Sequence, residues 1–412
     1  MQLRPHQSRA CDSMIAYDKG QIIFPTGGGK TLTMIYDLIE NCKYIDNGMT
    51  TVVVAPRILL AEQLSAEFLE FVDTKYTHVM HVHSGETHHF STTNPEKIAL
   101  FNNTARAAGE NVLIFTTYNS LDRIRLADIE VNTIYFDEAH NSVKKNFFPA
   151  TEHFSYETDR CYFFTATPKH SLTPNKPGMN IPEVYGQVIS KVPAPELIQG
   201  GFIIPPKVKA TKISTLISNV ADRDCKMIIE ILRDEDNMEK VMVAAKATKH
   251  IQNLMTQTQF MPLCNALGYD VLWITAKWGA FINGQKVNRE VFFDTMNEWG
   301  QDPTRKFIMF HHSILSEGIN VSGLTACILM RNMDVITMAQ TIGRVIRLNK
   351  DDASDLRTGK IAAGDLDQYR KPFGKMFVPV YSNVGISTQR TLQNVVDTIF
   401  CQGEPAISKV RK

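Results

Sequence analysis

Cysteine is scarce in this sequence and follows no pattern. The seven cysteines are scattered over 412 residues, and no Cys-x-x-Cys pair occurs among them. This distribution argues against a zinc site, an iron–sulfur cluster and a disulfide framework, and it is typical of proteins in a reducing compartment. We therefore expect an intracellular protein.

Long apolar runs and an excess of one charge are also missing. No apolar run reaches 18 residues, and the chain opens on polar residues rather than on a secretory leader, so we expect no membrane span. The 44 Lys and Arg residues nearly balance the 43 Asp and Glu residues, which leaves a formal net charge of +1. Any nucleic-acid site must therefore be a local groove. The length is typical of two or three globular domains.

Glycine, in contrast, is concentrated in the segment 25–31, Pro-Thr-Gly-Gly-Gly-Lys-Thr. The segment follows a short apolar run and precedes residues with helical periodicity. Strand, glycine loop and helix form the setting of a phosphate-binding loop of the Walker A type, where backbone N–H groups and a helix N-terminus face one anion. The strict pattern has glycine where this chain has Phe24, and the alternative is a simple Gly-rich turn. The residues expected to bind nucleotide here are Thr26, Gly27, Gly28, Gly29, Lys30 and Thr31, with Lys30 on the phosphates and Thr31 on Mg²⁺.

The segment 3–7, Leu-Arg-Pro-His-Gln, precedes the glycine loop in the chain. The side-chain amide of Gln7 could match the donor and acceptor pattern of adenine, and Arg4 could stack on the base. The alternative is that both are ordinary surface residues of a first helix.

Two apolar, β-branched runs, 50–56 and 111–118, are typical of buried parallel strands. Residues at the carboxyl end of such strands lie at the sheet edge where ligands bind. We therefore expect Pro56, Arg57, Thr116 and Thr117 to contact a nucleic-acid backbone. For the two threonines, capping of a following helix explains the pattern equally well.

A third apolar strand, within 131–140, delivers Asp137 and Glu138 to its carboxyl end. Phosphoryl hydrolysis needs one carboxylate to hold Mg²⁺ and a second group to orient or deprotonate the attacking water. We assign the first role to Asp137 and the second to Glu138. His140 and the hydroxyls of Thr165 and Thr167 are expected to couple this site to neighbouring elements.

Taken together, these segments resemble motifs Q, I, Ia, Ib, II and III of superfamily 2 helicases, as Gln7, GGGKT, APR, TTY, DEAH and TATP. The resemblance is to the DEAH-box branch that includes phage UvsW-like helicases and restriction-enzyme motor subunits. It implies an α/β fold of two RecA-like domains, each a mostly parallel β-sheet flanked by helices. It also implies ATP in a cleft between the domains and a nucleic-acid strand running across both.

The second half of the chain continues the resemblance. Segment 316–321 resembles motif V, which implies nucleotide contacts by Glu317 and Gly318. Lys246 and Lys249, which follow a strand-like run, are weaker candidates for nucleic-acid contacts on the second domain.

Segment 340–347 resembles motif VI, and its spacing places Gln340, Arg344 and Arg347 on one face of a helix. An arginine delivered from a second domain can stabilise charge on the γ-phosphoryl group in the transition state. Arg347 is our first candidate for this finger, with Arg344 beside it and Gln340 placing the water. The alternative is that the two arginines form surface ion pairs.

From these motifs we predict domain 1 at residues 1–190, a hinge at 191–206, domain 2 at 207–385, and a C-terminal helix with a basic tail at 386–412. The stretch 351–374 is polar, and we expect a loop there.

The predicted function is an ATP- and Mg²⁺-dependent DNA helicase or translocase that acts on forked or recombination substrates. Two alternatives stay open. One is an RNA helicase, and the other is an ATP-controlled motor subunit of a larger complex that separates no strands. A protein partner could set substrate choice, and the resemblance allows a phage or viral origin.

Overall fold

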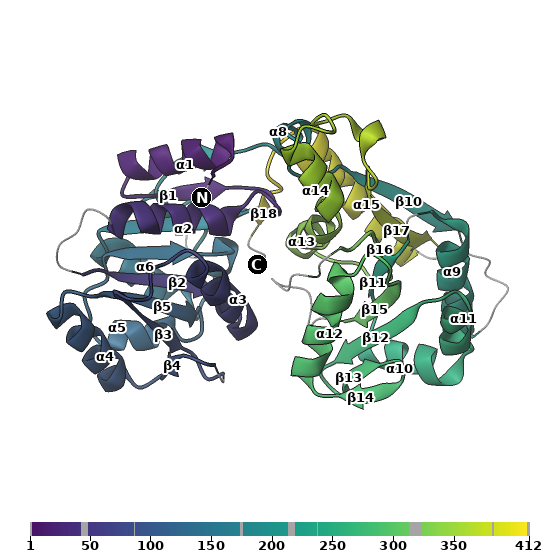
Figure 1. Cartoon of the computed structure of the whole chain (residues 1–412), viewed down its shortest axis with the longest axis horizontal. Coiled ribbons are helices and arrows are strands. Elements are labelled where there is room, and N and C mark those ends of the chain that lie inside the picture. Colours follow the sequence, from purple (N-terminus) through teal and green to yellow (C-terminus); the bar gives the residue numbers. More distant parts are fainter. Residues whose placement is uncertain are drawn as a thin grey trace. The chain divides into compact units, whose positions relative to one another are not determined.

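The computed structural model describes residues 2–42, 48–85, 87–173, 176–212, 219–236, 238–312, 321, 323–380 and 383–409 (Figure 1). The chain separates into two compact units. The first unit contains residues 1–193 and 405–412, and the second contains residues 194–404. Each unit is built around one eight-stranded sheet.

The first sheet has the strand order β4-β3-β5-β2-β6-β7-β1-β9, and every neighbouring pair in it is parallel. The carboxyl ends of its strands therefore share one edge. The strands of this unit are β1 (Lys19–Ile23), β2 (Thr50–Ala55), β3 (Thr77–Val82), β4 (Phe90–Ser91), β5 (Asn111–Thr117), β6 (Thr133–Phe136), β7 (Arg160–Thr165), β8 (Lys169–His170), β9 (Val188–Lys191) and β18 (Ser408–Lys409). Its helices are α1 (Pro5–Ala16), α2 (Lys30–Cys42), α3 (Ile58–Leu69), α4 (Pro95–Ala107), α5 (Leu121–Leu126), η1 (Ala139–Asn141), α6 (Phe148–Glu157) and α7 (Pro182–Tyr185).

Helices cover both faces of this sheet, which explains why its central strands are apolar throughout rather than alternating. All six residues of β2 are buried. Ile98 of α4 and Phe154 of α6 belong to the core on one face. On the other face, Phe68 of α3 meets Phe115 of β5 edge to face, with 5.5 Å between ring centroids.

The second sheet has the order β10-β17-β16-β11-β15-β12-β13-β14. It is parallel from β10 to β12, and β13 and β14 add an antiparallel meander at its edge. The strands are β10 (Pro206–Lys212), β11 (Lys240–Ala244), β12 (Asp270–Thr275), β13 (Gly279–Ile282), β14 (Gln285–Val287), β15 (Phe307–His311), β16 (Ala326–Leu329) and β17 (Gly374–Val380). The helices are α8 (Ala194–Gln199), α9 (Val220–Asp234), α10 (Thr248–Gln257), α11 (Phe260–Ala266), α12 (Arg289–Gln301), α13 (Val335–Val345), α14 (Lys350–Arg357), η2 (Leu366–Gln368), α15 (Asn383–Val396) and the π-helical turn η3 (Asp397–Cys401).

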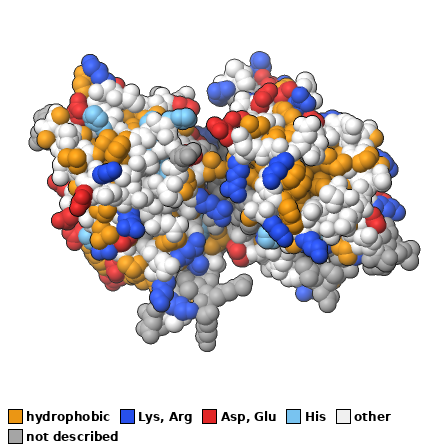
Figure 2. All heavy atoms as spheres, turned by 90° about the horizontal axis from the view of Figure 1, so that it is seen from below, with side chains coloured by type: hydrophobic (Ala, Val, Ile, Leu, Met, Phe, Trp, Pro, Cys, Tyr) orange, Lys and Arg blue, Asp and Glu red, His pale blue; other side chains and the backbone are white. Residues whose placement is uncertain are grey.

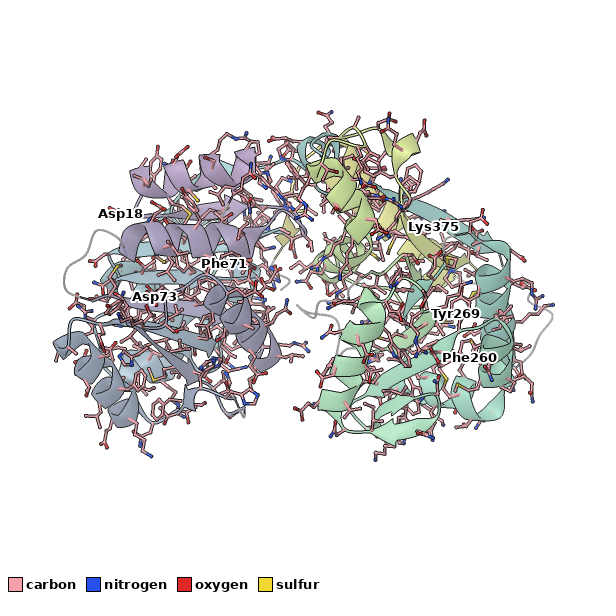
Figure 3. The ribbon with its side chains drawn as sticks, in the orientation of Figure 1. Asp18, Phe71, Asp73, Phe260, Tyr269 and Lys375 are labelled. Carbon is pink, nitrogen blue, oxygen red and sulfur yellow. The ribbon has the colours of Figure 1, made fainter. Side chains whose placement is uncertain are left out.

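One core of the second unit lies between this sheet and helices α9, α10 and α11. Figure 3 labels two of its side chains, Phe260 and Tyr269. The ring of Phe260 meets Phe310 of β15 edge to face at 5.3 Å, and the Tyr269 hydroxyl donates to the carbonyl of Met238 at 2.7 Å. The ring of Phe260 thus packs α11 against the sheet, and the buried Tyr269 hydroxyl keeps a hydrogen-bond partner.

Two parts of the chain differ from the sequence-based expectation. The stretch 351–374 is not all loop, because it contains most of α14, whose N-terminus is capped by the side chain of Asn349. Ser408 and Lys409, near the C-terminus, pair in parallel with β8 as β18, a strand that the sequence analysis does not predict. A two-residue strand carries too little pattern to be predicted from sequence.

The surfaces agree with the balanced composition. Figure 2 shows acidic and basic side chains on the face of each unit that is seen there. No helix within the described residues is both long enough and apolar enough to cross a membrane.

Candidate functional site

The glycine loop connects β1 to α2, as predicted from its flanking residues. The loop turns through Gly27 and Gly29, whose φ angles are 88° and 80°. The N–H of Gly28 donates to the carbonyl of Pro25 at 2.9 Å. A side chain at position 29 would be strained by this φ, and its Cβ would lie 2.4 Å from Nε2 of Gln7. The loop therefore requires glycine at position 29.

Three residues of the segment 3–7 donate hydrogen bonds to the backbone carbonyls of this loop. Arg4 Nη1 donates to the carbonyl of Gly27 at 3.2 Å, His6 Nε2 to that of Gly28 at 2.8 Å, and Gln7 Nε2 to that of Gly29 at 2.9 Å. Three consecutive carbonyls thus point toward the start of α1. Because the carbonyls of successive loop residues are bonded on this side, the loop conformation is fixed before any ligand binds.

These contacts exclude the alternative that Gln7 is an ordinary surface residue. Gln7 is fully buried, and its Oε1 accepts from the N–H of Arg4 at 2.9 Å. Gln7 therefore braces the loop through one N–H and one lone pair of its amide, and its contact with adenine stays a prediction. Sequence reasoning missed His6, which is 2% exposed and packs its ring edge on Phe24. Its position between the two candidate residues was the only available signal.

The carboxylates follow β6 at the same sheet edge as the glycine loop. Lys30, the first residue of α2, places its Nζ 3.4 Å from Oε1 of Glu138. Oε2 of Glu138 lies 3.5 Å from Nδ1 of His140. Glu138 adopts a left-handed backbone conformation, with φ 46° and ψ 52°, which is costly for a residue other than glycine and is typical of functional sites. The structure thus brings Lys30, Glu138 and His140 together, with Asp137 adjacent in the chain.

Asp137 is 6% exposed, and its environment disfavours negative charge. Burial, with the neighbouring Glu138 carboxylate as the second cause, raises the pKa of Asp137 to about 7, although Lys30 opposes the shift. Two buried carboxyl groups lie beside a single lysine, so this charge balance favours binding of a further positive charge.

This pKa predicts a pH dependence of folding. Since the carboxyl binds its proton more tightly in the folded state, its contribution to stability is fully present below about pH 4 and is lost as the pH rises through 7. Asp137→Asn removes this contribution. We expect the wild type to lose more stability than Asp137→Asn between pH 5 and pH 8, as measured by thermal unfolding of both proteins. Equal losses would contradict the shifted pKa.

The predicted coupling residues lie in direct contact. Nδ1 of His140 is 3.1 Å from Oγ1 of Thr165, and the same oxygen accepts from the N–H of Thr167 at 3.2 Å. All three residues are at most 4% exposed. Buried hydrogen bonds therefore join His140 to the segment that follows β7, and the same ring nitrogen lies 3.5 Å from Oε2 of Glu138.

The candidate nucleic-acid residues of the first unit occupy the same edge but differ in accessibility. Pro56 and Arg57 follow β2 and are half-buried. Thr116 is fully buried and donates its hydroxyl to the carbonyl of Val82 at 2.8 Å. The Thr116 hydroxyl is therefore bonded inside the sheet, and its contact with a phosphate stays a prediction. Thr117 is 3% exposed, and its Oγ1 lies 3.4 Å from the hydroxyl of Ser120.

The predicted helix of the second unit is present as α13, but it ends earlier than expected. Gln340 and Arg344 lie on α13 and are 6% and 4% exposed. Arg347 lies beyond the helix, which ends at Val345, so the prediction that all three share one helix face is wrong for Arg347. Its side chain is half-buried, and its carbonyl accepts from Nζ of Lys371 at 2.9 Å.

The other predictions for the second unit have different outcomes. Glu317 and Gly318 lie outside the described residues. Lys246 donates to Asp224 at 3.1 Å, while Lys249 is exposed. No group of three or more His, Cys, Asp or Glu residues in the described ranges has the arrangement of a metal site.

Comparisons with known proteins give a family match for part of the chain and a fold match for all of it. Residues 1–170 match the family model described as "Type III restriction enzyme, res subunit". The search of curated proteins found no match.

Two solved structures resemble the whole chain. The "ATP-dependent Type ISP restriction-modification enzyme LlaBIII bound to DNA" has a TM-score of 0.73 and 16% identity, over 100% of this chain and 31% of that one. The "nuclease-deletion mutant of the Type ISP restriction-modification enzyme LlaGI in complex with a DNA substrate mimic" has a TM-score of 0.66 and 17% identity, over 99% of this chain and 30% of that one. This chain therefore spans about a third of each structure. The likeness confirms the predicted fold of two RecA-like domains.

Proposed function

We propose that this chain is an ATP-dependent DNA translocase of superfamily 2, and that it hydrolyses ATP at the carboxyl edge of the first sheet. The observation that carries the proposal is the convergence of the preformed glycine loop, Lys30 and the Asp137–Glu138 pair at that edge. The family match over residues 1–170 and the two similar structures described as DNA complexes support it. The placement of the chain in the DEAH-box branch, with UvsW-like helicases, stays a prediction.

In this proposal the residues of the first unit have distinct tasks. The glycine loop and the start of α2 bind the phosphates, and Lys30 neutralises charge on them. Glu138 orients the attacking water and accepts its proton. Carboxylate and hydroxyl oxygens are ligands that suit Mg²⁺, so Asp137 and Thr31 would hold it. When bound, Mg²⁺ supplies positive charge that stabilises the phosphates.

In this proposal the second unit of the same chain contributes residues that complete the reaction. Arg347, Arg344 and Gln340 would reach the phosphates when the two domains close over ATP, which couples hydrolysis to domain closure. Pro56, Arg57 and Thr117 would contact the strand on the first domain. Glu317 and Gly318 keep their predicted nucleotide contacts, the segment 191–206 keeps its predicted role as hinge, and an intracellular location stays a prediction.

Steady-state ATP hydrolysis tests the proposed function. The assay compares no polymer, single-stranded DNA, duplex DNA, forked DNA and single-stranded RNA. We expect stimulation by DNA and little by RNA, and a preference for forks would indicate remodelling of branched substrates. Stimulation by RNA alone would favour an RNA helicase. ATP binding without stimulation by any polymer would favour a motor subunit that depends on a protein partner.

His6→Phe tests the bracing of the glycine loop. Phenylalanine keeps the packing on Phe24 but cannot donate to Gly28, and one lost hydrogen bond of about 0.5–1.5 kcal/mol corresponds to a weakening of roughly 2- to 10-fold. We expect KM for ATP to rise by this factor while kcat changes little. His6→Gln, which retains a donor, should recover part of the loss, and Ser8→Ala on the exposed side of α1 is the control. An unchanged KM in His6→Phe would refute the bracing role.

A further inference from the structure

Three consecutive backbone carbonyls, those of residues 137–139, accept hydrogen bonds from buried side chains. The donors are Tyr118 to Asp137 at 2.8 Å, Asn141 to Glu138 at 3.1 Å and Ser142 to Ala139 at 2.6 Å. All three donors are at most 2% exposed. The backbone N–H of Asn141 also donates to the carbonyl of Glu138, at 3.0 Å. A left-handed conformation persists only where the surroundings fix it, and Asn141 bonds the carbonyl of this residue twice.

A lysine determines which way the amide of Asn141 faces. Nζ of Lys144 lies 2.7 Å from Oδ1 of Asn141. Because an ammonium group can only donate, the amide oxygen must face Lys144, and the amide NH₂ group must face the carbonyl of Glu138. The same Nζ lies 5.5 Å from the ring centroid of Phe147, where a cation is attracted to the aromatic face.

The amide of Asn141 in turn determines where the ring of His140 carries its hydrogen. Nδ2 of Asn141 lies 3.3 Å from Nε2 of His140. Since an amide NH₂ group can only donate, Nε2 must accept, and the hydrogen of the neutral ring lies on Nδ1. This Nδ1 is 3.1 Å from Oγ1 of Thr165 and 3.5 Å from Oε2 of Glu138. An N–H at this position attracts the carboxylate, whereas a lone pair would repel it.

We propose that Asn141 positions the general base Glu138, by holding its backbone and by fixing the tautomer of His140, and that Lys144 orients the Asn141 amide for both tasks. A general base is effective only when its carboxylate is held within reach of the water. Asn141 acts through Glu138 and His140, so it is a positioning residue rather than a catalytic one. The role of Glu138 rests on the proposed function, whereas the hydrogen bonds of Asn141 do not depend on it.

The tautomer of His140 gives a test that needs no ATP. Asn141→Asp keeps the shape of the side chain and its pairing with Lys144, but it replaces the NH₂ donor with an acceptor. Long-range proton–nitrogen NMR spectra of protein labelled at the histidine nitrogens report the tautomer, and His140→Gln identifies the signal. We expect a hydrogen on Nδ1 alone in the wild type and a hydrogen on Nε2 in Asn141→Asp. A hydrogen on Nε2 in the wild type, or none there in the variant, would overturn the proposal.

The kinetic test uses Asn141→Ala in two backgrounds. In the wild type we expect kcat for ATP hydrolysis to fall by up to about 10²-fold with little change in KM, the effect of a misplaced catalytic group. In the Glu138→Gln background the same substitution should lower the residual rate much less, because the base that Asn141 positions is already absent. An equal loss in both backgrounds would show that Asn141 acts independently of Glu138.

Ser142→Ala is the matched control. It removes an equally buried hydrogen bond, to Ala139, but Ser142 has no hydrogen bond to Glu138 or His140 among the described contacts. We expect a lower unfolding temperature with the tautomer of His140 and kcat close to those of the wild type. If Ser142→Ala changed the tautomer and kcat as much as Asn141→Ala does, the effect would be general loosening of the segment rather than positioning.

Thermal unfolding checks that each variant folds, and Lys144→Met provides a second test at an exposed position. Loss of the ammonium group frees the amide of Asn141 to turn, so we expect a hydrogen on Nε2 of His140 in part of the molecules and a smaller loss of kcat than in Asn141→Ala. An unchanged tautomer and rate in Lys144→Met would refute the orienting role of Lys144. A wild type with the expected tautomer but no ATP hydrolysis would contradict the proposed function alone, and the wrong tautomer in an active enzyme would contradict only the positioning.

Discussion

Glu138→Gln is expected to lower the rate of ATP hydrolysis by about 10²–10⁴-fold while ATP still binds, the usual contribution of a positioned general base. The substitution keeps the shape of the side chain and removes its ability to accept a proton. Lys30 lies 3.4 Å from one carboxylate oxygen and His140 lies 3.5 Å from the other, and an amide of the same shape can keep both neighbours, so we expect the lost function to be chemical rather than geometric. Single-turnover hydrolysis and binding of a labelled ATP analogue measure the two effects separately.

The control for this substitution is Glu130→Gln. Glu130 lies in the same unit shortly before β6, and its side chain is 70% exposed in an ion pair with Arg106. Exposed pairs of this kind contribute little, so neither hydrolysis nor stability should change measurably. If Glu138→Gln hydrolysed ATP at close to the parent rate, another group would have to activate the water.

The strand-end positions of the first-unit motifs could be predicted because their strands are short, apolar and parallel. Once the runs around residues 50–55 and 133–136 are assigned to buried parallel strands, their carboxyl ends must share one edge. Lys30 and Glu138, 108 residues apart in the chain, meet at this edge because only β7 separates β1 from β6 in the sheet.

Hydrogen-bond partners could not be predicted in the same way. Gln7 and Thr116 were each assigned to a ligand, because an amide and a hydroxyl near a binding edge suit one. In the structure, Gln7 donates to the carbonyl of Gly29 and Thr116 to that of Val82, and the sequence indicated neither partner. Buried donors bond to the nearest acceptor, and that acceptor depends on contacts between distant segments that sequence periodicity does not describe.

Helix ends were a second source of error. The spacing of Gln340, Arg344 and Arg347 fits a continuous helix, but α13 ends at Val345 and the chain then turns toward Lys371. Sequence patterns identify helices better than they identify where helices end.

Because α13 ends at Val345, Arg344 lies within the helix and Arg347 lies outside it. Arg347→Ala is expected to lower DNA-stimulated hydrolysis by about 10³–10⁵-fold, the usual contribution of an arginine finger, without destabilising the second unit. The reason is that Arg347 is half-buried outside the helix, whereas Arg344 is 4% exposed and close to His311. Arg344→Ala should therefore lower the unfolding temperature as well as the rate.

Single-turnover hydrolysis at saturating ATP and DNA, together with thermal unfolding, separates the two arginines. Arg347→Lys should stay slow, because an ammonium group lacks the planar fork of guanidinium, and the exposed Arg357→Ala on α14 should match the wild type. A slow but stable Arg344→Ala, with Arg347→Ala at the parent rate, would move the finger to Arg344. If neither arginine affected hydrolysis, the first unit would complete the reaction alone, and hydrolysis would not depend on domain closure.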